Sequence, residues 1–127
     1  MPQIRIELEK GNTREFIVLL IETTMECVQD ILKLPNSDRN IRVMEYENGM
    51  FFTKAPYRIL IEISMFSGRT NETKKKLFQK IVTELSSELG LKKEEIFILI
   101  NEQAKENWGI RGGIPANEID LGFNVEI

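Results

Sequence analysis

Two residues that lie far apart in the sequence, Pro2 and Arg69, could together carry out acid–base chemistry. Removal of Met1, which precedes a small residue, gives Pro2 a free secondary amine whose direction the ring and the following chain fix. An α-amino group titrates near ~8, and burial or a nearby cation lowers that pKa toward the range where a base is most useful. Pro2 is therefore a candidate general base. The alternative is that a Met-Pro start has no catalytic meaning.

Arg69 is the candidate partner because its guanidinium can hold a carboxylate through two parallel hydrogen bonds. It follows Gly68 just after an expected strand. The alternative is a solvated arginine in a turn. The chain has no histidine, which excludes a Ser-His-Asp triad, a histidine base and nearly every zinc site.

Length and composition narrow the class of protein further. The chain of 127 residues has the size of one domain, and its 17 basic and 20 acidic residues give a net charge of −3. Such a surface does not attract a phosphate backbone, so we expect no nucleic-acid partner. We also expect no membrane partner, because no apolar run approaches ~20 residues. The single cysteine, Cys27, cannot form an internal disulfide, and we expect a cytoplasmic protein.

The sequence repeats itself at an offset of 57 residues. This repeat predicts two copies of one β-α-β unit within a single domain, 1–127. Ile4-Arg5-Ile6 aligns with Ile61-Glu62-Ile63, and Gly11-Asn12-Thr13 aligns with Gly68-Arg69-Thr70. We place repeat one at 2–56 and repeat two at 57–127.

Each repeat is expected to contain a strand, a helix and a second strand. Period-two alternation predicts strands over 3–8, 41–46 and 59–66. The run 96–100 is apolar on both faces, as in a central strand. The helices are expected to begin at Asn12, paired with Glu15, and at Thr70 or Asn71. We expect residues 35–38 to end the first helix and Gly90 to end the second. A Gly-rich loop over 108–115 and a last alternating strand up to Ile127 complete the chain.

The predicted fold is α/β (α+β): a four-stranded mixed sheet with two helices on one face and an additional C-terminal strand. The bare face calls for association with other copies, and we expect the terminal strand to reach a neighbour. If a pseudo-twofold axis relates the repeats, their first strands run antiparallel, which places Pro2 beside Arg69. The corresponding pair at the other end, Ile59 and Asn12, would be a vestigial second site.

Three stretches resemble the 4-oxalocrotonate tautomerase pattern: GRTNETK at 68–74, the strand leading to Asn101-Glu102, and NWGIRGG at 107–113. Together with Pro2 and the repeats, the resemblance to the tautomerase superfamily covers essentially the whole chain. It implies a homotrimer of fused repeats that uses an amino-terminal proline and no cofactor or metal.

The resemblance also implies roles for individual residues. Pro2 would be the general base and then the acid, and Arg69 would hold the substrate carboxylate. Trp108 would be an aromatic wall that excludes water, or else only a contact within the trimer. Phe97 stands where short family members carry a second arginine, and Arg42 occupies the comparable position of the first repeat.

Residues 35–39 look like the malonate semialdehyde decarboxylase branch, in which an aspartate at the position of Asp38 orients water. Ser67 replaces an additional arginine of that branch, which counts against decarboxylation, and Asp38 could instead simply cap or turn the chain. We expect a tautomerase acting on a small 2-oxo or 2-hydroxydienoate carboxylic acid. The alternatives are a hydratase or decarboxylase-like lyase with a protonated Pro2, and a non-catalytic binding or assembly module.

Overall fold

The computed structural model describes residues 1–127 and contains two consecutive β-α-β units. The first consists of β1 (Gln3–Glu9), α1 (Arg14–Leu32) and β2 (Ile41–Tyr46). The second consists of β3 (Ile59–Phe66), α2 (Asn71–Leu89) and β4 (Ile96–Gln103). No helix has both the length and the apolar character needed to cross a membrane.

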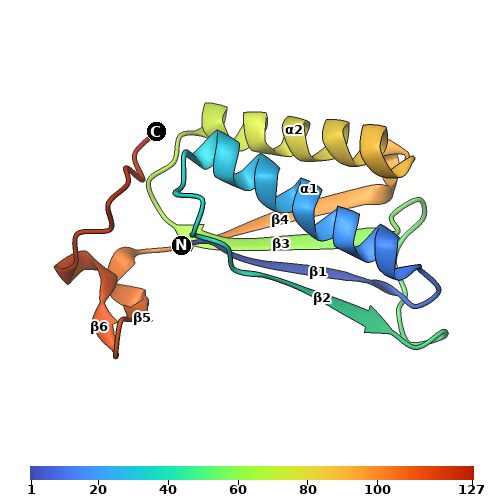
Figure 1. The fold of residues 1–127 in the computed structure, drawn as a ribbon, viewed down its shortest axis with the longest axis horizontal. Helices are drawn as coiled ribbons and strands as arrows, with labels where there is room; N and C mark the ends of the chain where they lie inside the picture. Colours follow the sequence, from blue (N-terminus) through green and yellow to red (C-terminus); the bar gives the residue numbers. More distant parts are fainter.

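The four strands form one mixed sheet in the order β2-β1-β3-β4, and both helices cover the same face (Figure 1). Within each unit the two strands are parallel, whereas β1 and β3 are antiparallel at the centre. The predicted fold, a four-stranded mixed sheet with two helices on one face, is confirmed. The antiparallel central pair places the start of each unit beside the end of the other unit's first strand.

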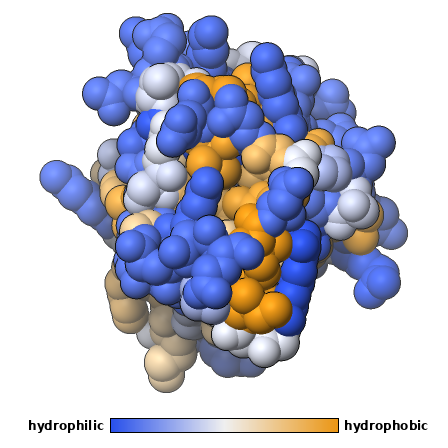
Figure 2. Space-filling model, turned by 90° about the vertical axis from the view of Figure 1, so that its left-hand side faces the viewer, coloured by the Kyte–Doolittle hydropathy of each residue, from blue (hydrophilic) through white to orange (hydrophobic).

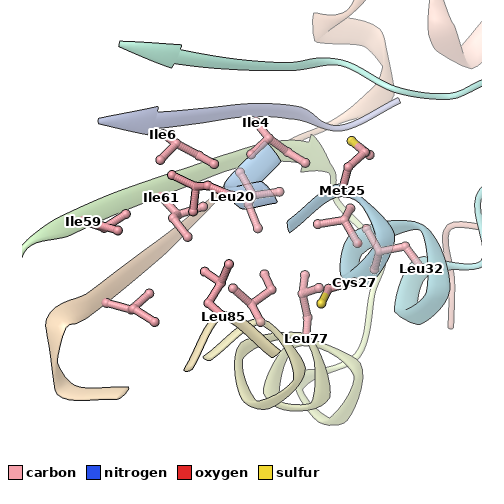
Figure 3. Close-up of a cluster of buried hydrophobic side chains, with 14 of the residues drawn as sticks. Ile4, Ile6, Leu20, Met25, Cys27, Leu32, Ile59, Ile61, Leu77 and Leu85 are labelled. Atoms are coloured by element: carbon pink, nitrogen blue, oxygen red, sulfur yellow. The ribbon is translucent and has the colours of Figure 1, made fainter. Parts of the chain in front are cut away.

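The alternating residues of β1 and β3 supply the floor of the core. Ile4, Ile6 and Ile63 are completely buried, and Ile61 is 1% exposed. They face apolar side chains from α1 and α2 that recur at helical spacing (Figure 3). The helices therefore hide one face of the sheet and leave the other open.

The expectation that residues 96–100 form a central strand is wrong, because β4 lies at the edge of the sheet. Ile98 and Ile100 pack against the core, but Phe97 and Leu99 are 42% and 43% exposed on the open face. A strand that is apolar on both faces need not be buried within its own chain, since exposed apolar residues also mark contacts with another chain.

The helix starts follow the repeat with one correction. Thr13, not Asn12, is the N-cap of α1, and its hydroxyl accepts a hydrogen bond from the Phe16 amide at 3.1 Å. The Asn12 side chain instead donates to the Glu9 carbonyl at 2.9 Å. Thr70 caps α2 in the same way and Gly90 ends it, both as predicted.

The first helix also stops earlier than the sequence suggested. It ends at Leu32, with Lys33 in the left-handed conformation, so the turn over 35–38 follows the end of α1 and does not form it.

The predicted C-terminal strand is absent. After β4, a short hairpin pairs β5 (Gly109–Ile110) with β6 (Ile114–Pro115), and residues 119–127 form an irregular segment, hereafter the tail. Asp120 and Asn124 accept hydrogen bonds from backbone amides two residues ahead, at 3.0 and 2.9 Å. Such local bonds compete with strand pairing.

The tail packs on its own chain, and its expected contact with a neighbouring copy stays a prediction. Val125 is buried beside Phe66, and the Ile127 carbonyl accepts hydrogen bonds from Thr70 and Thr73 at the start of α2. Both chain ends therefore lie at the same end of the sheet (Figure 1).

Candidate active site

The end of the sheet that holds both chain ends also holds three of the predicted site residues, Pro2, Asp38 and Arg69. Because β1 and β3 are antiparallel, Gln3 at the start of β1 pairs with Ser64 near the end of β3. Pro2 precedes this pair and Arg69 follows it closely along the chain. Viewed from this end, the molecule shows a strip of hydrophobic surface bordered by hydrophilic side chains (Figure 2).

The amino terminus lies against Asp38. The Met1 nitrogen is 3.2 Å from Asp38 Oδ2, and the Asp38 side chain is only 10% exposed. Asp38 Oδ1 accepts a hydrogen bond from Asn40 Nδ2, also at 3.2 Å. Pro2 itself is buried. Asp38 is therefore directed at the point where β1 starts.

Sequence reasoning missed the residue that positions Asp38. Gln29 on α1 is buried, and its Nε2 donates to the carbonyls of Pro35 and Asn36 at 3.1 Å each and to that of Asp38 at 3.4 Å. Because the Gln29 side-chain nitrogen contacts three carbonyl oxygens of residues 35–38, it holds this turn against α1. A buried polar residue on an otherwise apolar helix face is the sequence signal for such a role.

Arg69 is buried, yet most of its hydrogen-bonding capacity is unused. It is 4% exposed, and its one hydrogen bond is from Nη1 to the Phe66 carbonyl at 3.5 Å. Nε and Nη2 are buried and have no partner. Buried donors are nearly always paired, and these two nitrogens are suited to holding both oxygens of one carboxylate.

The charges at this end act on one another. Burial lowers the pKa of the Met1 ammonium, with a further lowering by the Arg69 charge, while Asp38 opposes the shift. Burial also lowers the pKa of the Arg69 guanidinium, and the carboxylates of Glu102 and Asp38 oppose that shift. The structure thus brings the amino terminus, Asp38 and Arg69 together, in surroundings that favour a neutral amine.

Aromatic side chains from the end of the chain pack beside this group. The Trp108 ring meets the Phe66 ring edge-on with centroids 4.8 Å apart, and Phe123 stacks on Phe66 at 6.5 Å. Trp108 Nε1 donates to the Gln103 carbonyl at 3.3 Å. Met1 packs against the same cluster. Trp108 therefore lies in the aromatic cluster that Met1 contacts.

Phe97 and Arg42 are not joined to this group within one copy of the chain. Phe97 lies near the start of β4, at the opposite end of the sheet, where it packs on Tyr57 and lines a pocket of about 340 Å³. Arg42 is exposed on β2, and its Nη1 donates to Gln3 Oε1 at 3.4 Å. No hydrogen bond or ion pair connects either residue to Asp38 or Arg69.

Comparisons with known proteins identify the family of the chain. The family described as "Tautomerase enzyme" matches residues 31–111. The probable tautomerase YusQ of Bacillus subtilis (strain 168) is 28% identical over 121 residues, which covers 89% of this chain and 95% of YusQ. The 2-hydroxymuconate tautomerase of Comamonas testosteroni is 34% identical over 58 residues, which covers 46% of this chain and 90% of that enzyme.

Solved structures share the fold over nearly the whole chain. FG41 malonate semialdehyde decarboxylase, inhibited by 3-bromopropiolate, has a TM-score of 0.78 at 25% identity, covering 94% of this chain and 98% of the other. The Q0 fused 4-OT, solved as a symmetric trimer, has a TM-score of 0.81 at 18% identity, covering 91% and 96%. Since the family match spans more than half of the sequence, the chain belongs to the tautomerase enzyme family.

Proposed function

We propose that the chain, once Met1 is removed, is a cofactor-independent tautomerase that acts on a small 2-oxo or 2-hydroxydienoate carboxylic acid. The observation that carries this proposal is the pair of unpartnered buried nitrogens on Arg69, at the end of the sheet where β1 starts and Pro2 is buried. The Arg69 nitrogens provide a place for a substrate carboxylate, and the amine that removal of Met1 would free on Pro2 provides a base.

In the proposed mechanism Arg69 Nε and Nη2 hold the substrate carboxylate, and the neutral Pro2 amine removes a proton from the carbon next to the carbonyl. The same nitrogen then returns the proton one or two carbons away along the conjugated system. The Arg69 charge also stabilises the enolate that forms between these two steps. Trp108, packed on Phe66, shields the nitrogen from water and so favours its neutral form.

The alternative chemistry uses the same site with a protonated Pro2. Asp38 Oδ2 lies 3.2 Å from the Met1 nitrogen, just ahead of Pro2, and raises the pKa of the Met1 ammonium, although burial outweighs this effect. In that case Asp38 would orient a water molecule for hydration or decarboxylation. The similarity to FG41 malonate semialdehyde decarboxylase supports keeping this alternative.

The first test combines intact mass with activity. We expect the native-host protein to lack the mass of Met1. It should convert 2-hydroxymuconate to its 2-oxo isomer, followed by the change in ultraviolet absorbance. Pro2→Ala keeps a free amine but loses the ring, and we expect kcat/KM to fall about 100-fold, within the usual contribution of a general base. A processed Pro2→Ala protein with full activity would show that the proline ring is not needed, and full activity in protein that retains Met1 would rule out proton transfer by the Pro2 amine.

The pH profile separates the two chemistries. Burial lowers the pKa of the Met1 ammonium in the unprocessed chain, and we expect burial at the same end of the sheet to lower the pKa of a free Pro2 amine as well. For tautomerisation, kcat/KM rises as pH increases through this pKa and then stays level. For hydration or decarboxylation by a protonated Pro2, kcat/KM falls over the same interval, and malonate semialdehyde is the substrate to test.

We further propose that the protein works as a homotrimer. The open face of the sheet carries exposed apolar side chains at its β4 edge, and the Q0 fused 4-OT has the same fold and is a symmetric trimer. In such an assembly Arg42 and Phe97, which do not reach the site of their own copy, become available to a neighbouring copy.

A further inference from the structure

The proposed mechanism does not use an ion pair that joins α2 to β4 at the same end of the sheet as Arg69. Lys74, in the first turn of α2, donates from Nζ to Glu102 Oε1 near the end of β4. Glu102 is in register with Met65 on β3, which is completely buried under the helices. Both members of the pair are partly buried, at 22% and 28% side-chain exposure.

Glu102 is close enough to Arg69 for its charge to act on the guanidinium, but it does not bind it. Glu102 opposes the lowering of the Arg69 pKa. Its carboxylate is nevertheless hydrogen-bonded to Lys74, and Arg69 keeps Nε and Nη2 without a partner. A buried arginine and a nearby carboxylate would ordinarily pair, since a buried unpaired charge is costly.

We propose that Lys74 is a positioning residue that holds Glu102 away from Arg69 and so keeps the two Arg69 nitrogens free for the substrate carboxylate. The inference rests on the proposed function, because it assumes that Arg69 binds a carboxylate. Glu102 and the substrate are competing carboxylates. The Lys74 ammonium, at the start of α2, forms an ion pair with Glu102. Arg69 is therefore left free to bind the substrate carboxylate.

The direct test is Lys74→Met, which keeps the length of the side chain and removes its charge. Released Glu102 should then pair with Arg69 and compete with the substrate. We expect KM to rise about tenfold while kcat stays within about twofold, because substrate that does bind meets an unchanged base. Lys76→Met, on the same helix and exposed, removes the same charge and should leave KM unchanged.

A rescue experiment distinguishes positioning from a direct role. In Lys74→Met/Glu102→Gln the competing charge is gone, and KM should return to near the wild-type value. An unchanged KM in Lys74→Met overturns the proposal. A raised KM that the second substitution does not restore overturns it too, since Lys74 would then attract the substrate by itself. Lys74→Gln, measured in parallel with its thermal unfolding, guards against a packing fault of the methionine variant.

Calorimetric binding of oxalate separates this proposal from the mechanism as a whole. Wild-type protein should bind oxalate, Arg69→Met should not, and Lys74→Met should bind it about tenfold more weakly. If Arg69→Met loses binding but Lys74→Met does not weaken it, positioning by Lys74 is wrong and the Arg69 role stands. If wild type neither binds oxalate nor converts 2-hydroxymuconate, Arg69 is not a carboxylate site and both proposals fail.

Discussion

At the scale of single residues, Arg69 has a structural cost that a bound carboxylate would offset. Its side chain is almost fully buried, and two of its nitrogens have no hydrogen-bond partner. Leaving buried donors unpaired destabilises a fold by about 1–3 kcal/mol. A residue that is costly to the empty protein and useful to the liganded one is typical of a binding site.

This cost leads to a prediction about stability. Arg69→Met keeps the apolar stem and removes the unpaired charge, so we expect the free energy of unfolding in urea to rise by about 1–3 kcal/mol. Activity should fall in the same variant. Arg14→Met, at an exposed arginine, should change stability by less than about 0.5 kcal/mol. A clear loss of stability in Arg69→Met would mean that the guanidinium is satisfied in the folded protein.

Cys27 illustrates the opposite case of a reactive residue type in an inert position. It is 2% exposed, and burial raises the pKa of its thiol to about 11. Because the thiolate is the reactive form, we expect a disulfide reagent at pH 8 to react far more slowly with folded than with urea-unfolded protein. Release of the reagent's chromophore measures both rates. Equal rates would show that the region around Cys27 opens readily.

The sequence identified some site residues better than others, for a physical reason. The proximity of Pro2 and Arg69 follows from the repeat and the antiparallel pairing it implies, and the structure places both at one end of the sheet. The Lys74–Glu102 pair and the carbonyl contacts of Gln29 depend on register and rotamer. Such details emerge only when the elements are packed together.

At the scale of elements, the two helix N-caps form a matched pair. Thr13 and Thr70 occupy equivalent positions, and each hydroxyl accepts a hydrogen bond from the amide three residues ahead at 3.1 Å. Thr70 has a second task, because its hydroxyl also donates to the Ile127 carbonyl at 3.1 Å. One cap therefore serves its helix alone, and the other also holds the tail.

This difference predicts unequal effects of the same substitution. Thr13→Ala should cost about 1 kcal/mol of unfolding free energy, the usual value for a lost N-cap. Thr70→Ala should cost more, about 2 kcal/mol, and should speed proteolysis within 119–127. Urea unfolding and limited proteolysis measure the two effects. Equal costs with an equally resistant tail would show that the contact with Ile127 contributes nothing.

The sequence predicted correctly the elements whose hydrophobic pattern determines which of their faces is buried. Period-two alternation with a helix between the strands gave the strand β3 with its observed bounds, and the left-handed Gly90 marked the end of α2. The same alternation failed for the tail, where side-chain-to-backbone bonds at Asp120 and Asn124 take the place of a partner strand. An alternating sequence forms a strand only where another strand is available to pair with it, and the tail has no such partner within its own chain.

At the scale of the whole molecule, the open sheet face divides into a polar centre and apolar borders. In the centre Arg5 forms ion pairs with Glu7 and Glu62. Phe97 and Leu99 remain exposed along β4. Exposed apolar side chains at the border of a sheet face fit a contact between copies better than a surface that stays in water.

This distribution predicts which substitution separates the copies. Phe97→Lys should convert the trimer into monomers without unfolding it, because residue 97 lies on the open face, away from the core. Val18→Lys, at a side chain 47% exposed on α1, should leave the trimer intact. Sedimentation velocity measures the mass, and circular dichroism checks the fold. A Phe97→Lys protein that remains trimeric would place the contact elsewhere.

Because both chain ends lie at the candidate site, the way in which the protein is prepared will determine what is measured. A purification tag fused ahead of Met1, or a cleavage scar left there, keeps the Pro2 nitrogen in an amide bond and removes its basicity. An extension after Ile127 starts where that residue's carbonyl contacts Thr70 and Thr73. Recombinant protein with an authentic amino terminus is therefore the material on which a negative assay would be meaningful.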